Sequence, residues 1–224
     1  MEPTGLAKVS RSTLADSVCD SIRSAVLNHQ MEPGERLSID RLAVELEVSQ
    51  TPVREALSRL AADSLVEYEP LVGYRVTSPL GSREFDQLME ARFAIEPTLA
   101  GLAAERRPAP EIPELESYIS LGGGDVDMDH YERYRQHTAR DSSFHLAISW
   151  LAQNEFLAGA LNGLNAHLHI YRLHHPESGI DSSDHEHRQI ASAISEGDSE
   201  QAEQAMIAHL DASYHRHSAG LLAS

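Results

Sequence analysis

Four residues of this sequence have side chains that commonly bind metal ions, and their spacing assigns them to helix faces. Asp141 and His145 are four residues apart, so on a helix both side chains project from the same face. His187 and His209 each lie on the apolar face of a predicted helix, where an imidazole costs free energy unless it is paired. These side chains could converge from three helices on one ion. His185 points about 200° away from His187 on the helical wheel and remains the rival for its role.

Three imidazoles and one carboxylate suit zinc, nickel, manganese or iron, and they leave coordination positions open for a ligand or water. The pattern is compatible with three functions: a metal-assisted sensor of small molecules, a direct sensor of the metal ion, and a metalloenzyme that activates water. The sequence shows no convincing nucleophile or acid–base partner near these residues, and Glu186 is expected to point elsewhere. An enzyme is therefore the least favoured of the three.

A single arginine interrupts an apolar stripe near residue 90. Arg92 shares its predicted helix face with Leu88, Ile95, Leu99 and Leu102. An inward arginine needs an anionic partner, and two partners fit: an internal carboxylate (Glu96 or Asp141), or a carboxylate effector held by a bidentate clamp. Further candidates for effector contacts are Tyr134, Asn154 and Arg172.

A second chemical signature lies on the predicted helix over residues 49–60. One arc of the helical wheel is apolar and holds Val53, Ala56, Leu57 and Leu60. A separate arc is polar and holds Gln50, Thr51, Arg54 and Ser58. Arginine and glutamine can pair with base edges, and hydroxyls can contact phosphates, so this face is typical of a recognition helix in the DNA major groove.

The elements that must position this helix are short. A helix is predicted over residues 13–27, with Leu14, Val18, Ile22 and Val26 on one face. Ser38 is predicted to cap a second helix, and residues 65–68 and 73–76 alternate like two strands of a hairpin. Three helices followed by a hairpin predict a winged helix-turn-helix.

From Arg83 onward the pattern is helical, with breaks at prolines and glycines. Gly197-Asp198 marks the end of one helix and the start of another, with Asp198 and Gln201 spaced as a capping box. The fold class is therefore mainly α, with about six helices after the winged head. The predicted organisation is a DNA-binding domain over residues 1–78, a linker over 79–82 and a helical domain over 83–224.

Composition limits the environment and the partners. The 224 residues carry a net charge of −17, and residues 1–80 hold 8 basic against 12 acidic side chains, which disfavours tight non-specific DNA binding. The only cysteine, Cys19, cannot form an internal disulfide and is expected in the core of a protein from a reducing compartment. No apolar stretch is long enough for a membrane helix, so we expect a cytoplasmic protein without membrane contact.

Residues 42–60, with the core Thr51-Pro52-Val53-Arg54-Glu55-Ala56-Leu57, resemble the GntR family of bacterial regulators. The resemblance implies a dimeric winged helix-turn-helix that binds a palindromic double-stranded operator. It also implies a set of DNA contacts, namely Arg36, Ser49, Gln50, Thr51, Pro52, Arg54, Ser58, Gly73 and Tyr74. Two departures remove positive charge from the expected interface: Gln50 stands where the family usually has arginine, and Leu71-Val72 stand in a wing that is often basic.

The C-terminal part resembles the FCD effector domain of the FadR-type subfamily. The matching motifs are Asp141-x-x-x-His145, Glu186-His187 and His209-Leu210. Many members of that subfamily hold a divalent metal with one Asp and three His, which implies Asp141, His145, His187 and His209 as ligands here. Their effectors are often small organic acids. The resemblance therefore implies a homodimeric regulator, more often a repressor, that responds to a small carboxylate.

Overall fold

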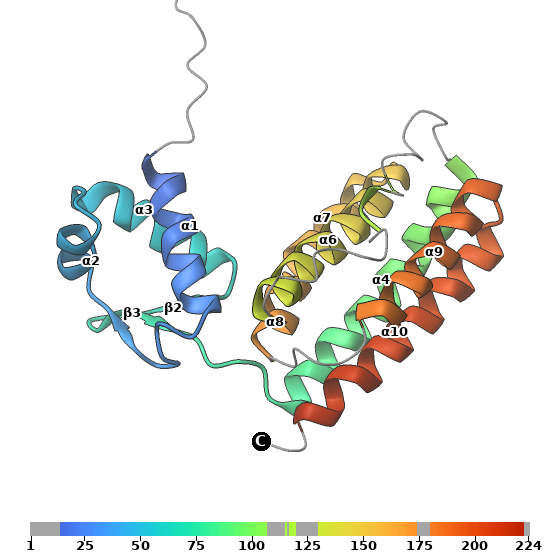
Figure 1. Ribbon diagram of the computed structural model, residues 1–224. Helices are drawn as coiled ribbons and strands as arrows, with labels where there is room; N and C mark the ends of the chain where they lie inside the picture. Colours follow the sequence, from blue (N-terminus) through green and yellow to red (C-terminus); the bar gives the residue numbers. More distant parts are fainter. Residues whose placement is uncertain (1–13, 107–114, 116, 120–129, 174–179, 222–224) are drawn as a thin grey trace, which may run out of the picture. The chain divides into compact units, whose positions relative to one another are not determined.

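The computed structural model describes residues 14–106, 115, 117–119, 130–173 and 180–221 (Figure 1). The chain divides into two compact units, residues 1–78 and 79–224. In the described part of the chain, no helix combines the length and the apolar character needed to cross a membrane.

Three helices and a small sheet build the N-terminal unit. The helices are α1 (Leu14–Leu27), α2 (Ile39–Glu45) and α3 (Gln50–Ala62). The strands are β1 (Arg36–Leu37), β2 (Val66–Glu69) and β3 (Gly73–Val76), and they pair antiparallel in the order β1-β3-β2. The predicted winged helix-turn-helix is confirmed. The strand β1 was not predicted, because two residues are too few to show an alternating pattern.

Apolar faces explain why these helices pack. On α3, Val53, Ala56, Leu57 and Leu60 are all fully buried, as predicted from the helical wheel. On α1 the predicted stripe is only partly right: Val18, Ile22 and Val26 are buried, whereas Leu14 is 58% exposed. Residues spaced by four drift by about 40° per step around a helix. Leu14 therefore leaves the buried face, which Ala15 and Cys19 complete.

Polar residues end and begin these helices as expected. Ser38 caps α2, where its hydroxyl accepts a hydrogen bond from the Arg41 backbone N–H at 3.4 Å. Asp198 caps the last helix by accepting from the Gln201 backbone N–H at 3.0 Å. The preceding Gly197 has φ 76°, a left-handed conformation that glycine adopts at helix ends without strain.

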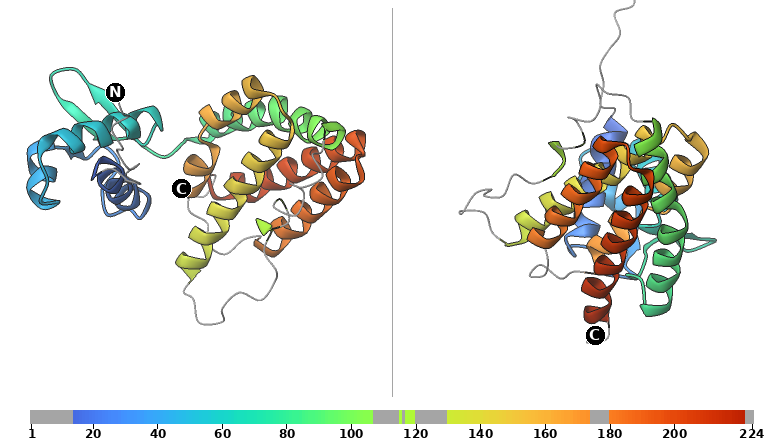
Figure 2. Two further views of the ribbon diagram at one scale, coloured as in Figure 1. Left: turned by 90° about the horizontal axis from the view of Figure 1, so that it is seen from above. Right: turned by 90° about the vertical axis from the view of Figure 1, so that its right-hand side faces the viewer.

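Six helices make up the described part of the C-terminal unit, and the prediction of a helical bundle is confirmed. They are α4 (Ser82–Arg106), α6 (His130–Leu151), α7 (Glu155–Gly163), α8 (Ala166–Arg172), α9 (Ile180–Glu196) and α10 (Ser199–Leu221). Helix α4 packs against α10 along much of its length, and α9 packs against α10 (Figures 1 and 2). A Cβ at Gly101 on α4 would lie 2.5 Å from Glu203 Oε1, so glycine permits this close approach.

Candidate metal centre

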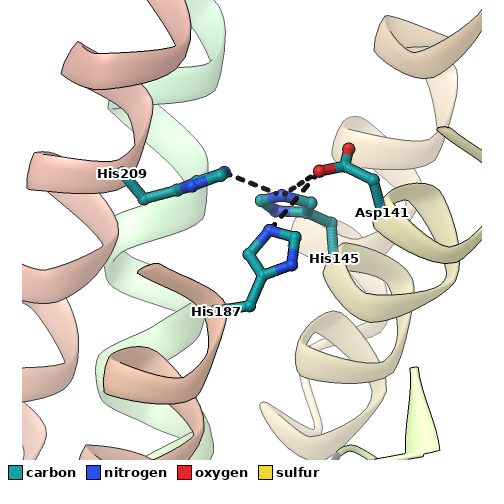
Figure 3. Close-up of side chains that lie close together, drawn as sticks. All are labelled: Asp141, His145, His187 and His209. Atoms are coloured by element: carbon teal, nitrogen blue, oxygen red, sulfur yellow. Dashed lines mark hydrogen bonds and ion pairs between the residues drawn. The ribbon is translucent and has the colours of Figure 1, made fainter. Parts of the chain in front are cut away.

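Four predicted metal ligands meet inside the helical unit. Asp141 and His145 come from α6, His187 comes from α9 and His209 from α10 (Figure 3). One ligand atom from each residue lies within 4.8 Å of all the others. All three histidines are buried, and Asp141 is half-buried. His185, the predicted rival of His187, is exposed and is not in this cluster.

The ring nitrogens that face the centre are Nε2 atoms. His209 Nε2 lies 3.2 Å from His145 Nε2. Asp141 Oδ1 lies 3.4 Å from His187 Nε2 and 3.9 Å from His145 Nε2. The Nε2 of His187 is buried without a hydrogen bond. Three nitrogen donors and one carboxylate oxygen therefore point into one small volume.

The Nδ1 atoms of two histidines face carboxylates that lie behind them. His209 Nδ1 is 2.8 Å from Glu186 Oε2, and His145 Nδ1 is 2.5 Å from Glu96 Oε2. The second contact has hydrogen-bond length but not hydrogen-bond alignment, so both of its atoms lack a well-oriented partner. Each carboxylate is in turn paired with an arginine: Arg92 Nε donates to Glu96 at 2.5 Å, and Arg216 donates twice to Glu186, at 2.6 and 2.9 Å.

These contacts control the charges around the centre. Burial raises the pKa of Glu186, but hydrogen bonds from His209 and Arg216 outweigh it and lower the pKa to about 2. Burial also raises the pKa of Glu96, and Arg92 and His145 outweigh it, so the pKa lies well below its ordinary value. Burial raises the pKa of Asp141 as well, but the nearby imidazoles of His187 and His145 outweigh it and hold the pKa well below its ordinary value. Burial lowers the pKa of His209 to about 3, against the opposing effect of Glu186.

The arrangement has the chemistry of a site for a divalent cation. Its donors are imidazole nitrogens and one carboxylate, which suit zinc and other divalent transition metals. Two nitrogens that share an ion at about 2.0–2.1 Å lie about 3.0–3.4 Å apart. The 3.2 Å between the Nε2 atoms of His145 and His209 falls in that range.

A small pocket opens beside the candidate ligands, with a cavity volume of about 40 Å³ and an opening to solvent. Its charged wall holds Arg92, Glu96, Asp141 and His145. The other lining residues are polar or apolar, namely Ser142, Leu146, Leu161, Asn162, Ala166, His167 and Ile170. The pocket thus places a small cavity, open to solvent, beside the candidate metal position.

The predicted effector residues have different surroundings. Arg92 lines the pocket, but its side chain is paired with Glu96, one of the two internal partners expected for it. Asn154 does not line this pocket; it is the N-cap of α7, where its side chain accepts from the Leu157 backbone N–H at 3.2 Å. Arg172 is buried on α8 and does not line this pocket either, and burial lowers its pKa. The side chain of Tyr134 lies outside the described residues.

The predicted DNA contacts fall mostly on the surface of the winged unit. Ser49, Gln50, Thr51, Arg54 and Ser58 are exposed along α3, and Arg36 is exposed on β1. Pro52 is instead buried in the first turn of α3, because it shares a helix face with Ala56, four residues later. Gly73 and Tyr74 are half-buried at the start of β3.

Gln50 and Arg54, two exposed residues on the proposed DNA-binding face, are hydrogen-bonded to each other. Gln50 Nε2 donates to Asp40 Oδ1 at 2.5 Å, and the Gln50 Oε1 accepts from Arg54 at 3.3 Å. Both groups of the Gln50 amide are therefore engaged within the protein. This link between α2 and α3 was not expected from the sequence.

Sequence reasoning also missed the residues behind the centre. Glu186 was expected to point elsewhere, yet it contacts His209, and Arg216 was not singled out at all. Glu186 is 23 residues before His209 and 30 residues before Arg216 in the chain. The spacing of residues along one helix cannot predict a contact over such a separation. The adjacency of Glu186 to His187 was the one local indication.

Comparison with known proteins places both units in one family. Residues 14–76 match the model of bacterial regulatory proteins of the gntR family, and residues 87–212 match the FCD domain. The chain is 30% identical over 208 residues to the "HTH-type transcriptional regulator LutR" of Bacillus subtilis, covering 83% of this chain and 92% of that protein.

Two further proteins agree with this match. The chain is 29% identical over 211 residues to the "Probable D-xylose utilization operon transcriptional repressor" of Paenarthrobacter nicotinovorans, covering 92% of this chain and 89% of that protein. The solved structure of Escherichia coli McbR/YncC shares the fold, with a TM-score of 0.67 at 20% identity, over 91% of this chain and 96% of that one. The relatives are named as transcriptional regulators, and the prediction that this protein is not an enzyme is confirmed. The chain belongs to the GntR family of bacterial regulatory proteins and carries an FCD domain after its winged helix-turn-helix.

Proposed function

We propose that this regulator is a repressor whose binding to a palindromic operator is controlled by a small organic acid, held beside a divalent metal ion in the helical unit. The observation that carries the metal part is the 3.2 Å contact between the Nε2 atoms of His145 and His209. The observation that carries the acid part is the pocket with Arg92 in its wall.

The Nε2 contact has an electrostatic consequence. Glu96 and Glu186 are each paired with an arginine, so both act as carboxylates that only accept hydrogen bonds. A proton on Nδ1 of His209 satisfies Glu186, and a proton on Nδ1 of His145 faces Glu96 at 2.5 Å. With both protons in these positions, both Nε2 atoms are lone pairs. Two lone pairs facing each other at 3.2 Å repel, and a cation bound between them removes the repulsion.

The charges around the centre favour an anionic ligand. The Arg92–Glu96 and Arg216–Glu186 pairs are each neutral, and Asp141 contributes one negative charge. A divalent ion changes this balance to one net positive charge in a low-dielectric interior, which a monocarboxylate neutralises. When bound, the ion supplies a Lewis-acidic site for a carboxylate oxygen. The apolar side chains of Leu146, Leu161 and Ile170 suit the hydrocarbon part of such an acid.

The DNA part rests on α3 and on the relatives. In a homodimer, two copies of this helix reach successive major grooves, where Arg54 and Thr51 are available for bases or phosphates. The sense of regulation is taken from the Paenarthrobacter relative, which is named a repressor. The acid controls the operator only if it binds two arrangements of the dimer with different affinities.

The first experiment selects DNA from sheared genomic fragments with purified, metal-loaded protein near physiological salt. We expect enrichment of a short palindrome by the wild type and by Arg83→Ala, which removes an exposed arginine from the helical unit. Arg54→Ala should lose the enrichment, because it removes the arginine from the proposed DNA face. Failure of the wild type to enrich any palindrome contradicts the operator proposal.

A second arm tests control by a panel of small carboxylic acids with and without a chelator. Release of DNA by an acid only in the metal-loaded protein supports the proposed control. Release by the acid that is unaffected by chelation contradicts the role of the metal. DNA binding that follows metal concentration without any acid indicates a direct metal sensor instead.

A further inference from the structure

We propose that two arginine–glutamate pairs are positioning residues for the metal centre: Arg216 with Glu186 for His209, and Arg92 with Glu96 for His145. Each glutamate holds the Nδ1 proton of its histidine and so directs the Nε2 lone pair to the ion. The inference rests on the proposed metal site and adds the residues that orient its ligands.

The contacts of Glu186 give this inference its strongest support. Its two oxygens accept from both Arg216 nitrogens at 2.6 and 2.9 Å, and one of them also lies 2.8 Å from His209 Nδ1. Arg216 and His209 are on α10, whereas Glu186 is on α9. The bidentate pair fixes the plane of the carboxylate, and the carboxylate then fixes one tautomer and one ring orientation of His209.

Glu96 faces His145 from another helix and is assigned the same role, on a contact of 2.5 Å that is not aligned as a hydrogen bond in this structure. It lies on α4, is 1% exposed, and is held by Arg92 one helical turn earlier while it contacts His145 of α6. Arg92 and Glu96 also line the effector pocket, so changes at these residues disturb both sites. Glu186 and Arg216 do not line that pocket, and they allow ligand positioning to be tested separately.

The third histidine, His187, has no arginine–glutamate pair behind it among the contacts of the described residues, and its ring is restrained by stacking instead. His187 stacks on Phe144, with ring centroids 4.2 Å apart and an angle of 20° between the planes. Stacking restrains the ring plane but does not choose which nitrogen carries the proton. Control of the tautomer is therefore assigned to Glu96 and Glu186.

The test uses the full-length protein and Zn²⁺ as the probe. Affinity is measured by competition with a chelating dye for the wild type, Glu186→Gln and Arg216→Gln. We expect Glu186→Gln to weaken zinc binding about 10- to 100-fold, because outer partners of metal-bound histidines contribute affinity of this size. Arg216→Gln keeps the glutamate and should cause a smaller loss in the same direction.

A matched control is Asp211→Asn. Asp211 also lies on α10 and has a histidine within 3.7 Å, His215, but both side chains are exposed and outside the centre. Zinc affinity of this variant should equal that of the wild type within about twofold. Circular dichroism and thermal unfolding establish that each variant remains folded.

A second readout is independent of metal binding. Nitrogen-15 NMR of the histidine rings in metal-free protein reports which nitrogen of His209 is protonated. We expect the Nδ1-protonated form in the wild type and in Asp211→Asn, and a mixture of both tautomers in Glu186→Gln. If the wild type shows this form but binds no zinc, the proposed metal site is wrong and the positioning by Glu186 stands. If zinc affinity and the His209 tautomer are both unchanged in Glu186→Gln, the inference is wrong.

Discussion

His185 and His187 are two residues apart on α9 and have opposite surroundings. His185 is exposed, whereas His187 is 1% exposed, stacks on Phe144 and directs Nε2 toward Asp141. A two-residue step rotates a side chain by about 200° around a helix, so only one of the pair can face the core. At this scale, direction rather than residue type separates a candidate ligand from a surface histidine.

This difference predicts the outcome of two alanine substitutions. His187→Ala removes a nitrogen donor and should weaken zinc binding at least about 100-fold, since a four-ligand site loses one ligand and its geometry. His185→Ala is the matched control and should bind zinc as the wild type does. Isothermal titration of both variants checks the prediction, and equal losses in the two would contradict the assignment of His187.

At the scale of single elements, Asn154 shows how a polar residue can resemble a binding residue. Its side chain accepts from the Leu157 backbone N–H and caps α7, so its contact is local. Helix α7 also supplies Leu161 and Asn162 to the pocket wall. In this structure Asn154 thus contacts the backbone of α7 and does not line the pocket, and its predicted contact with an effector stays a prediction.

Substitution of Asn154 separates these two roles. Asn154→Ala should lower the free energy of unfolding by about 1 kcal/mol, which is the usual cost of losing an N-cap. Asn154→Ser restores a capping oxygen and should recover most of that loss. Denaturant unfolding measures the stability, and organic-acid binding should be equal in both variants once they are folded. A loss of acid binding in the serine variant would instead assign Asn154 to the effector site.

The link between α2 and α3 leads to a prediction for DNA binding. Asp40 engages the amide of Gln50 and places a carboxylate beside the helix that is proposed to approach phosphates. Asp40→Asn should tighten operator binding several-fold at low salt, and less at high salt, because phosphate attraction is screened by ions.

Glu45→Gln is a suitable control for this change. Glu45 is exposed on the same helix, and the variant removes one negative charge without touching Gln50. Fluorescence anisotropy with the selected operator compares the variants across salt concentrations. Equal gains in both indicate charge alone, whereas a change of preferred sequence only in Asp40→Asn indicates that Gln50 has been released to read bases. Weaker binding by Asp40→Asn would contradict the prediction.

At the scale of the whole molecule, the division into two units separates the two chemistries. All four candidate ligands and both arginine–glutamate pairs lie in residues 79–224, and the proposed DNA face lies in residues 1–78. Most of the net charge of −17 also falls in the second unit, because residues 1–80 hold only 8 basic and 12 acidic side chains. Metal binding should therefore directly stabilise the helical unit, residues 79–224, against unfolding.

Calorimetry tests this expectation. Zinc at about 100 times its dissociation constant stabilises the folded state that binds it by about 2.7 kcal/mol. We expect the unfolding transition of the helical unit to rise with zinc and to fall with a chelator, while that of the winged unit stays unchanged. The His187→Ala variant should show no shift with zinc. A shift of both transitions by the same amount would show that the units unfold together.

Local sequence patterns were sufficient for the helices and the hairpin, though not for strand β1, and for placing Asp141 and His145 on one helix face. The four-residue spacing of Asp141 and His145, the buried face of α3 and the caps at Ser38 and Asp198 all follow from contacts within a few residues. Such contacts depend on the geometry of a single helix, which the order of residues already contains. The apolar faces that carry His187 and His209 indicated that both could join the other two, and the resemblance to a family strengthened this expectation.

Tertiary structure decided what depends on contacts between helices. His145 and His209 are 64 residues apart in the chain, and their Nδ1 atoms face Glu96 on α4 and Glu186 on α9. The contact between Asp40 on α2 and Gln50 on α3 is likewise a contact between helices. The sequence determines which side chains lie on each face of a helix. Which of these side chains contact one another is determined by how the helices pack, because the periodicity of one helix carries no information about the position of another.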